Sequence, residues 1–344
     1  MSEEIRRYKG ERRKRKIKKR VRFLLRLINV ENEKIVENYL LHPDEYVREF
    51  TVTVNGRKKK ITTYAKGIKG DQLLGIHAAI VKKLSARYEF ASNSYAFQKG
   101  TGVKQCIEQH LNSTRFFKTD IHKYFDSITF ENVSKKIKKT KLLPKFHQDK
   151  LLAACFYKGT LPIGFISSPI ISDVYLHDFD QCMLSHNGLI YTRYADDLIF
   201  SVNADHPEIN FGTIREEVEE LIAKEHLELN YKKTYTRYLN QEGDAIHLLG
   251  VNLVRQEGKQ NRITIGNKFI KDTSKAIAEL LTMPAEEAQK RLYEVSGKIS
   301  FIKYYSEESF AKLERMFNAH TKLGISLTRA NLEAIVDSRV GRAD

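Results

Sequence analysis

The sequence predicts an α+β fold, in which short buried strands and amphipathic helices occur in the same chain. Residues 116–120 and 189–201 are apolar runs rich in aromatic and β-branched side chains, as is typical of buried strands. Residues 49–64 alternate β-branched and polar side chains around Asn55-Gly56, the strongest short-range signal for a β-hairpin. Residues 70–84 and 214–224 instead repeat apolar side chains at helical spacing. A chain of 344 residues is long enough for two or three subdomains.

The N-terminal segment is strongly basic, most densely at residues 12–22. As a helix, it would place Ile17, Val21, Leu24 and Leu25 on one stripe and cations on the remaining surface. Such a helix would suit an RNA backbone. A solvated arm is the alternative, because like charges in a block repel one another.

The elements that follow are predicted from local patterns. In the helix at 70–84 we expect five side chains to pack inward: Leu73, Leu74, Ile76, Ile80 and Val81. A glycine-containing turn at 95–102 leads into a short helix that ends near His110, which we interpret as a packing or hydrogen-bonded histidine. A strand at 262–266 is followed by helices at about 268–282, 285–304 and 307–321, and the residues after Leu323 carry no recognisable motif.

Adjacent carboxylates at Asp196-Asp197 are the most informative feature of the chain. They fall at a predicted turn between two buried strands, where two like charges with little water around them need a cation. Asp120 ends the predicted strand 116–120 and is expected to face Asp196 from an adjacent strand. Oxygen ligands of this kind hold Mg²⁺, and three aspartates with a triphosphate suit a two-metal phosphoryl-transfer site. An isolated Asp-Asp pair would more simply be a hairpin turn.

Five motifs in order resemble those of reverse transcriptases over residues 50–255. They are Asp120 with the following aromatic turn 121–125, the loop 161–169 (LPIGFISSP), Tyr194-Ala195-Asp196-Asp197, the segment 229–234 (LNYKKT) and the turn 247–251 (HLLGV). The short bacterial enzymes of retrons and phage defence are the most similar group, and residues 188–198 and 295–302 are also retron-like.

The resemblance implies a right-hand polymerase with an antiparallel palm sheet. Its parts would be a basic helical extension (1–45), fingers (46–115), a palm (116–255) that includes inserted helices at about 130–160, a helical thumb (256–325) and a tail (326–344). Lysines of the thumb would grip the duplex: Lys268, Lys271, Lys298 and Lys303.

The resemblance also implies roles for individual residues. Asp120, Asp196 and Asp197 would be catalytic and would hold two Mg²⁺ ions, with Mn²⁺ as a substitute, together with the backbone of Ile121. The nucleotide-binding candidates are Lys58, Lys60, Phe125, Gly164 and Lys233. The candidates for contact with nucleic acid are Lys99, Gly100, Ser167, Pro169, Tyr194 and Gly250.

Two of these roles have alternatives. Strand alternation places Lys58 and Lys60 on one face of the hairpin, so we expect only that pair to face a nucleotide, although lysines also protect solvated edge strands. Phe125 lies five residues after Asp120, where a bulky aromatic in this family excludes a ribose 2′-hydroxyl and favours a DNA product. A core phenylalanine is the alternative.

The chain also departs from the retron pattern. Of the Asn-Ala-x-x-His expected before the first aspartate only His110 is present, and Leu248-Leu249-Gly250 stands where Val-Thr-Gly is usual. Ile163 replaces the glutamine expected near the nucleotide. A retron enzyme and a related defence-associated enzyme therefore both remain open.

Composition indicates the class of partner. A net charge of +16 attracts polyanions, so we expect a nucleic-acid partner and salt-dependent binding. Three widely spaced cysteines, Cys106, Cys155 and Cys182, argue against disulfides and a zinc site and favour the cytoplasm. No apolar run approaches the length of a membrane span, so we expect no membrane partner.

We therefore predict an RNA-directed DNA polymerase that adds dNTPs to a primer 3′-hydroxyl. Its expected partner is a structured non-coding RNA that serves as template, or as both template and primer. An effector protein and an oligomer remain open as further partners. Two alternatives remain. One is a defence polymerase that works without a template or from a protein primer, and the other is an RNA-binding scaffold whose chemistry is idle.

Overall fold

The computed structural model describes residues 30–54, 56–140 and 148–340. Contacts divide the chain into two compact units, the first comprising residues 1–100, 118–199 and 210–235. The second comprises residues 101–117, 200–209 and 236–344. The basic stretch 12–22, with its predicted helical stripe, lies outside the described residues.

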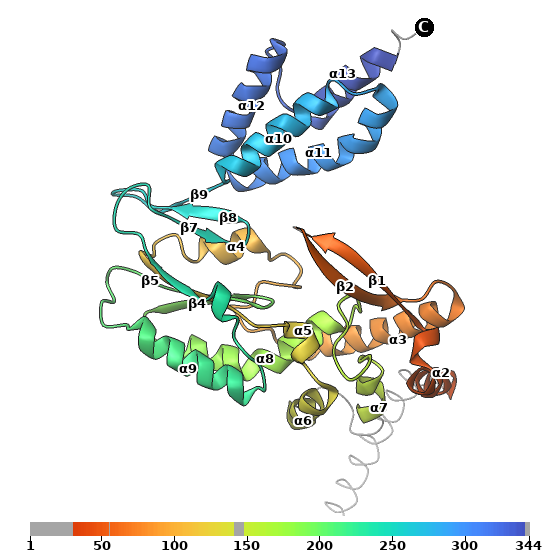
Figure 1. Cartoon of the computed structure of the whole chain (residues 1–344). Helices are drawn as coiled ribbons and strands as arrows, with labels where there is room; N and C mark the ends of the chain where they lie inside the picture. The colour runs from red at the N-terminus through yellow and green to blue at the C-terminus, as the bar shows by residue number, and fades with distance from the viewer. Residues whose placement is uncertain (1–29, 55, 141–147, 341–344) are drawn as a thin grey trace, which may run out of the picture. The chain divides into compact units, whose positions relative to one another are not determined.

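The first unit begins with two helices and the predicted hairpin (Figure 1). Helix α2 (Val30–Leu41) and the 3₁₀ turn η1 (Pro43–Glu45) precede β1 (Val47–Val54) and β2 (Arg57–Tyr64). The two strands pair antiparallel from Val47 opposite Tyr64 to Val54 opposite Arg57, so the hairpin prediction is confirmed.

Helix α3 (Ile68–Ser85) follows, where the sequence predicted 70–84. Leu73, Ile76 and Ile80 are buried as expected, each burial contributing about 1.5–3 kcal/mol. Leu74 is 36% exposed, so the expectation that it packs inward is wrong. Helical spacing explains the difference, because position 74 lies about 100° around the helix from position 73 and the buried stripe passes through His77 instead.

A four-stranded sheet carries the predicted carboxylates. Its strands lie in the order β4 (Leu189–Tyr194), β5 (Asp197–Val202), β3 (Arg115–Asp120) and β6 (Tyr235–Tyr238). Helix α8 (Ser168–Leu184) packs on β4, where Tyr191 contacts Phe179 (Figure 1). Helix α9 (Phe211–Lys224) contacts α8 through Glu217 and Cys182. Both strands predicted for 189–201 are confirmed, with the Asp-Asp pair at their turn.

Short elements complete the first unit. Strand β3 is followed by three short helices, α5 (Tyr124–Ser127), α6 (Phe130–Thr140) and α7 (Gln148–Ala153). The 3₁₀ turn η2 (Tyr231–Lys233) precedes β6. The loop 161–167 leads into α8.

The second unit contains the short helix α4 (Val103–Glu108) and a three-stranded antiparallel sheet of β7 (Ala245–Leu248), β8 (Val251–Val254) and β9 (Arg262–Thr264). Beyond α4, His110 is fully buried and its Nδ1 lies 2.6 Å from the Ser201 hydroxyl. Burial lowers the pKa of His110 to about 3, so the ring is neutral and structural, as predicted.

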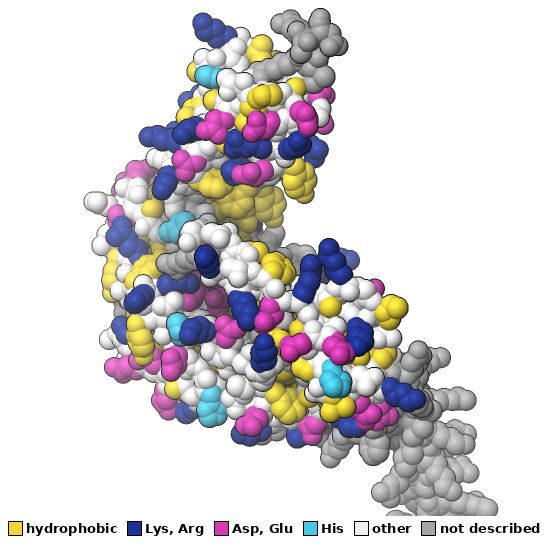
Figure 2. All heavy atoms as spheres, turned by 45° about the vertical axis from the view of Figure 1, so that its right-hand side comes forward, with side chains coloured by type: hydrophobic (Ala, Val, Ile, Leu, Met, Phe, Trp, Pro, Cys, Tyr) yellow, Lys and Arg dark blue, Asp and Glu magenta, His cyan; other side chains and the backbone are white. Residues whose placement is uncertain are grey.

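Four helices complete this unit: α10 (Asn267–Leu280), α11 (Ala285–Tyr305), α12 (Glu307–Thr321) and α13 (Arg329–Val340). The first three match the predicted helices, whereas α13 lies in the segment that carried no motif. They enclose Leu280, Val295, Leu313 and Val336, whose exposed fractions are all zero. Figure 2 shows basic side chains, with acidic ones among them, over the helices of this bundle.

Two further features bear on the environment of the protein. In the described part of the chain, none of the helices has the length and apolar character needed to cross a membrane. Among the residues that the structure describes, Cys106, Cys155 and Cys182 form no disulfide, and Cys106 and Cys155 are buried.

Candidate active site

Three carboxylates converge at one end of the four-stranded sheet. Asp120 is the last residue of β3, and Asp196 and Asp197 lie at the turn from β4 to β5, the strand next to β3. One oxygen from each carboxylate lies within 4.8 Å of the others. The sequence prediction that Asp120 faces the Asp196-Asp197 turn is therefore confirmed.

The backbone holds this turn in a defined conformation. Ala195 has φ of 56°, in the left-handed region that costs a residue with a Cβ atom about 1 kcal/mol. The amide of Ile121 donates a hydrogen bond of 2.9 Å to the carbonyl of Asp196. This bond ties the end of β3 directly to the carboxylate turn.

Asp120 is almost completely buried and both of its oxygens are hydrogen-bonded. Asn230 Nδ2 donates to Oδ1 at 3.0 Å, and Lys233 Nζ donates to Oδ2 at 2.6 Å. Burial works to lower the pKa of Lys233, but its hydrogen bond to Asp120 and the attraction of the three carboxylates outweigh it, so the pKa is raised. Lys233 is therefore a cation beside the aspartates.

Asp197 has a lysine partner of its own. Lys118 Nζ lies 3.0 Å from Asp197 Oδ1, and the two side chains are 13% and 25% exposed. Lys118 is two residues before Asp120 on β3, so strand alternation places both side chains on the same face of the sheet.

Asp196 shows most clearly that the site suits a cation. Burial, followed by the charges of Asp120 and Asp197, raises its pKa to about 6. A carboxylate with this perturbation is stabilised when a cation binds beside it. Three oxygen donors of this kind fit a hard divalent ion such as Mg²⁺.

A buried ionic network between β4 and α8 stabilises the strand that leads into the turn. Arg193, on β4, is 1% exposed and donates to Asp180 and Asp173 of α8 at 2.6 Å and 2.7 Å. Tyr191 also donates to Asp180, and Ser94 also donates to Asp173. The network fixes β4 one residue before Tyr194, and therefore fixes the direction in which the carboxylates leave the strand.

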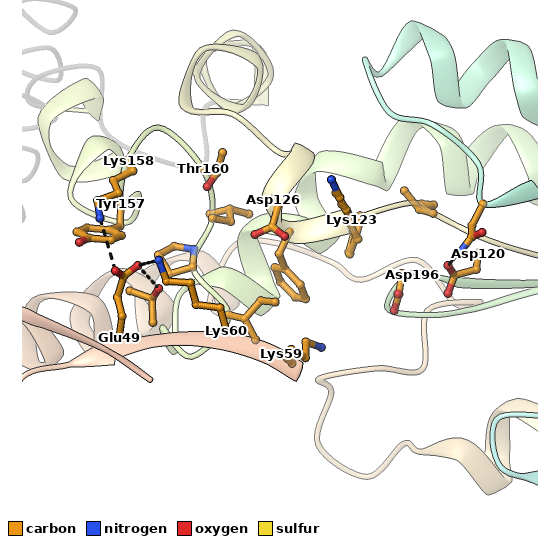
Figure 3. A pocket seen from close by; sticks show the side chains of 18 of the residues that line it. Glu49, Lys59, Lys60, Asp120, Lys123, Asp126, Tyr157, Lys158, Thr160 and Asp196 are labelled. Carbon is orange, nitrogen blue, oxygen red and sulfur yellow. Dashed lines mark hydrogen bonds and ion pairs between the residues drawn. The ribbon is translucent and has the colours of Figure 1, made fainter. Parts of the chain in front are cut away.

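A cavity of about 550 Å³ extends from the carboxylates to the β1–β2 hairpin. Asp120 and Asp196 lie at one end, and Glu49, Lys60 and Lys158 lie at the other (Figure 3). Phe125 and Ile163 contribute apolar walls. The cavity therefore combines carboxylates at one end with lysines along its wall.

The hairpin lysines partly match the prediction. Lys58 and Lys60 line the cavity as expected, and Lys60 also pairs with Glu49 at 2.8 Å. Lys59 lines the cavity as well, so the expectation that only one pair could face it is wrong. A two-stranded ribbon twists strongly and a lysine side chain is long, so strict alternation does not limit which lysines reach the cavity.

Of the other two nucleotide-binding candidates, Phe125 lines the cavity, whereas Gly164 follows the lining residue Ile163 in the loop. Phe125 is half-buried on α5, lines the cavity and meets the ring of Phe97 edge-on, with the centroids 6.3 Å apart. Gly164 has φ of 126°, and a Cβ atom there would lie 2.6 Å from the Thr62 carbonyl oxygen. The Thr62 amide donates to the Ile163 carbonyl, so the loop 161–167 is joined to β2.

The candidates for contact with nucleic acid lie in different surroundings. Lys99 and Gly100 are exposed, and Tyr194 and Pro169 are half-buried. Ser167 is fully buried, with its hydroxyl 3.5 Å from His77 Nδ1, so its side chain is turned away from solvent. Gly250, in the second unit, has φ of 94° in the two-residue turn between β7 and β8.

Sequence reasoning missed several residues that support the carboxylates. Lys118 had a signal, since a lysine two residues before Asp120 on a strand shares its face. The sequence also contained a signal for Arg193, because a charged side chain within a buried strand needs a buried partner. Asn230 stood in a recognised motif, but the sequence did not indicate that it binds Asp120.

Comparisons with known proteins agree with this geometry. The family model described as reverse transcriptase (RNA-dependent DNA polymerase) matches residues 72–253. The Escherichia coli retron Ec86 reverse transcriptase is 24% identical over 277 residues, which cover 77% of this chain and 78% of that protein. The retron Ec83 reverse transcriptase of Escherichia coli is 29% identical over 140 residues, covering 37% of this chain and 45% of that protein.

Among solved structures, apo telomerase from Candida tropicalis matches with a TM-score of 0.47 and 12% identity, over 85% of this chain and 67% of that one. The family model covers more than half of the sequence and includes all three aspartates. The chain is thus similar to retron enzymes of Escherichia coli, and it belongs to the reverse transcriptase family of RNA-directed DNA polymerases, with the fold of the right-hand polymerases.

Proposed function

We propose that this reverse transcriptase copies a dedicated structured non-coding RNA into DNA, as part of a bacterial retron or antiphage defence system in the cytoplasm. The observation that carries the proposal is the convergence of Asp120, Asp196 and Asp197, with an oxygen of each within 4.8 Å of the others. The similarity to retron enzymes of Escherichia coli supports the choice of RNA, and the charge of +16 supports a polyanionic partner.

In this proposal the three carboxylates hold two Mg²⁺ ions, for which Mn²⁺ can substitute. When bound, such ions activate the primer 3′-hydroxyl and neutralise charge on the leaving pyrophosphate. The Ile121 carbonyl is the further oxygen ligand in this proposal, on a residue whose amide donates to the Asp196 carbonyl. Lys233, held at 2.6 Å from Asp120, stabilises negative charge on the triphosphate or donates a proton to the leaving group.

Nucleotide selection is assigned to the cavity wall. Lys58 and Lys60 attract the triphosphate from the hairpin, and the ring of Phe125 occupies the space that a ribose 2′-hydroxyl needs. Gly164 lets loop 161–167 approach β2 closely enough to form that wall. The product is therefore DNA.

Contacts with template and primer are assigned to Lys99, Gly100, Pro169, Tyr194 and Gly250. Residues 46–115 act as fingers, 116–255 as palm and 256–325 as thumb, the last with lysines on α10 and α11. An effector protein and an oligomer are compatible with this arrangement.

Sequencing the product tests the proposal. The purified protein, with and without its co-purified RNA, is supplied with all four dNTPs and Mg²⁺. We expect DNA complementary to the RNA, and no product after the RNA is removed. Homopolymer or repeat DNA made without RNA would instead show a template-independent or protein-primed polymerase.

An Asp197→Asn variant provides the second arm of this test. Loss of DNA synthesis and of biological activity together is expected, because the carboxylate triad is then incomplete. Full biological activity in this variant would show that the protein acts as an RNA-binding scaffold whose chemistry is idle.

A further inference from the structure

We propose that Lys118 is a built-in counterion of the metal-free site, which a divalent cation must displace from Asp197, and that Lys118 thereby sets the affinity for free metal. The inference rests on the proposed metal site and concerns a residue outside the predicted set. It starts from the 3.0 Å ion pair between Lys118 Nζ and Asp197 Oδ1.

The burial of Lys118 and its position on β3 make this ion pair part of the carboxylate site. Its side chain is 13% exposed, much less than an ordinary surface lysine. It shares a face of β3 with Asp120, while Thr119 between them points the other way and hydrogen-bonds Thr234 at 2.7 Å. A lysine held by a strand beside two carboxylates is kept at the site whether or not metal is bound.

Charge balance explains what such a lysine does. Three carboxylates and the two lysines that bind them, Lys118 and Lys233, leave a net charge of about −1 when all are ionised. Without Lys118 the same group carries about −2 and attracts a divalent ion more strongly. Lys118 therefore stabilises the metal-free protein and weakens the binding of free ions.

Competition for one carboxylate adds to this effect. An ion that is bound through Asp197 Oδ1 must take the place of the ammonium group, and the two cations then repel each other at short range. Lys233 binds a different carboxylate, Asp120, whose other oxygen accepts a hydrogen bond from Asn230. The triphosphate of a nucleotide supplies the negative charge that Lys118 removes, so tight metal binding is reserved for the complex with nucleotide.

The test measures binding of Mn²⁺ alone to the full chain, without nucleic acid or nucleotide. The signal of free Mn²⁺ in electron paramagnetic resonance gives the dissociation constant at low ionic strength. We expect Lys118→Gln to bind Mn²⁺ about tenfold more tightly than the wild type. We also expect its melting temperature to be lower without metal and to rise further when Mg²⁺ is added. Lys118→Arg keeps the charge and should bind Mn²⁺ as the wild type does.

Lys123→Gln is the matched control. Lys123 lines the cavity together with Asp120 and Asp196 (Figure 3), but within the described part of the chain it forms no ion pair with the three aspartates. Its removal should leave the Mn²⁺ affinity almost unchanged. An equal gain in affinity in Lys123→Gln would overturn the proposal, because the effect would then come from general charge and not from the ion pair.

The remaining outcomes separate the two proposals. If wild-type protein binds Mn²⁺ and Lys118→Gln binds it equally or more weakly, the metal site stands and the counterion role fails. If the wild type binds no divalent cation, both are overturned. If Lys118→Gln fails to fold, Lys118→Arg provides the test. The arginine variant must then have the stability and the Mn²⁺ affinity of the wild type.

Discussion

Arg193 forms a buried ion pair with Asp180, in which Nη2 of the guanidinium lies 2.6 Å from Oδ2 of the carboxylate. The two side chains are 1% and 0% exposed. Burial raises the pKa of Asp180 although Arg193 works against it, so the carboxylate depends on its partner to stay ionised. Because Arg193 lies on β4 shortly before the turn that carries Asp196 and Asp197, the pair links the stability of the sheet to the position of Asp196.

The first prediction concerns this pair. Asp180→Asn leaves a buried guanidinium with one carboxylate partner fewer, and should lower the free energy of unfolding by about 3–5 kcal/mol. Urea denaturation measures the change. Arg215→Gln is the control, because Arg215 pairs with Glu219 on the surface of α9 and should contribute at most about 0.5 kcal/mol. Similar effects of both substitutions would show that the buried network is not important for stability.

The second prediction concerns the contact between loop and hairpin at Gly164. Gly164→Ala places a Cβ atom 2.6 Å from the Thr62 carbonyl, so the loop must move away from β2. We expect kcat/KM for dNTP incorporation to fall about tenfold, mainly through KM, because the cavity wall shifts. Steady-state primer extension gives both constants.

Gly159→Ala separates the clash from backbone strain. Gly159 also has positive φ, at 85°, but a Cβ atom there meets nothing within 4 Å. It should cost about 1 kcal/mol of stability through its backbone and leave KM for dNTP unchanged. An unchanged KM in Gly164→Ala would contradict the assigned role of this loop.

The third prediction concerns pH and Asp196. Its pKa is raised from 3.8 to about 6, so between these values the native protein binds a proton more tightly than the unfolded chain does. The contribution of Asp196 to the free energy of unfolding therefore decreases as pH rises through this window, by roughly 3 kcal/mol in total. Metal-free urea denaturation of wild type and Asp196→Asn at pH 4 to 7 measures it.

In that comparison the wild type should lose stability relative to the variant as pH rises, and added Mg²⁺ should restore it near neutral pH. A stability difference that does not vary with pH would mean that Asp196 is not crowded by the other two carboxylates.

The fourth prediction concerns sugar selection by Phe125. Phe125→Ala opens the cavity wall, so incorporation of ribonucleotides should rise and the ratio of kcat/KM for dNTP over rNTP should fall at least about tenfold. Single-nucleotide extension with each substrate gives the ratio. Phe97→Ala removes the neighbouring ring and should change the ratio much less. If Phe125→Ala retains full discrimination, the ring is a packing residue.

Local patterns were sufficient to predict much of this fold. Asn55-Gly56 predicted the hairpin, and Asp196-Asp197 between apolar strands predicted the turn from β4 to β5, because both signals lie within a few residues. The position of Asp120 beside that turn was also predicted, since a carboxylate at the end of a buried strand needs a shared cation.

Contacts between distant segments were not predictable in this way. Lys118 meets Asp197 only because β3 lies next to β5, and the sequence of neither strand reveals the order of the strands in the sheet. Arg193 and Asp180 meet because α8 packs on β4. Leu74 and Lys59 show the limits of simple periodicity, since small rotations of a helix or the twist of a hairpin decide which side chains face inward.

The most direct test of the central claim is anomalous diffraction from crystals soaked in Mn²⁺ with a dNTP. The account predicts anomalous density within about 2.1 Å of oxygens from Asp120, Asp196 and Asp197, and loss of that density in Asp197→Asn. Ordered Mn²⁺ bound elsewhere, with these three carboxylates carrying none, would contradict it.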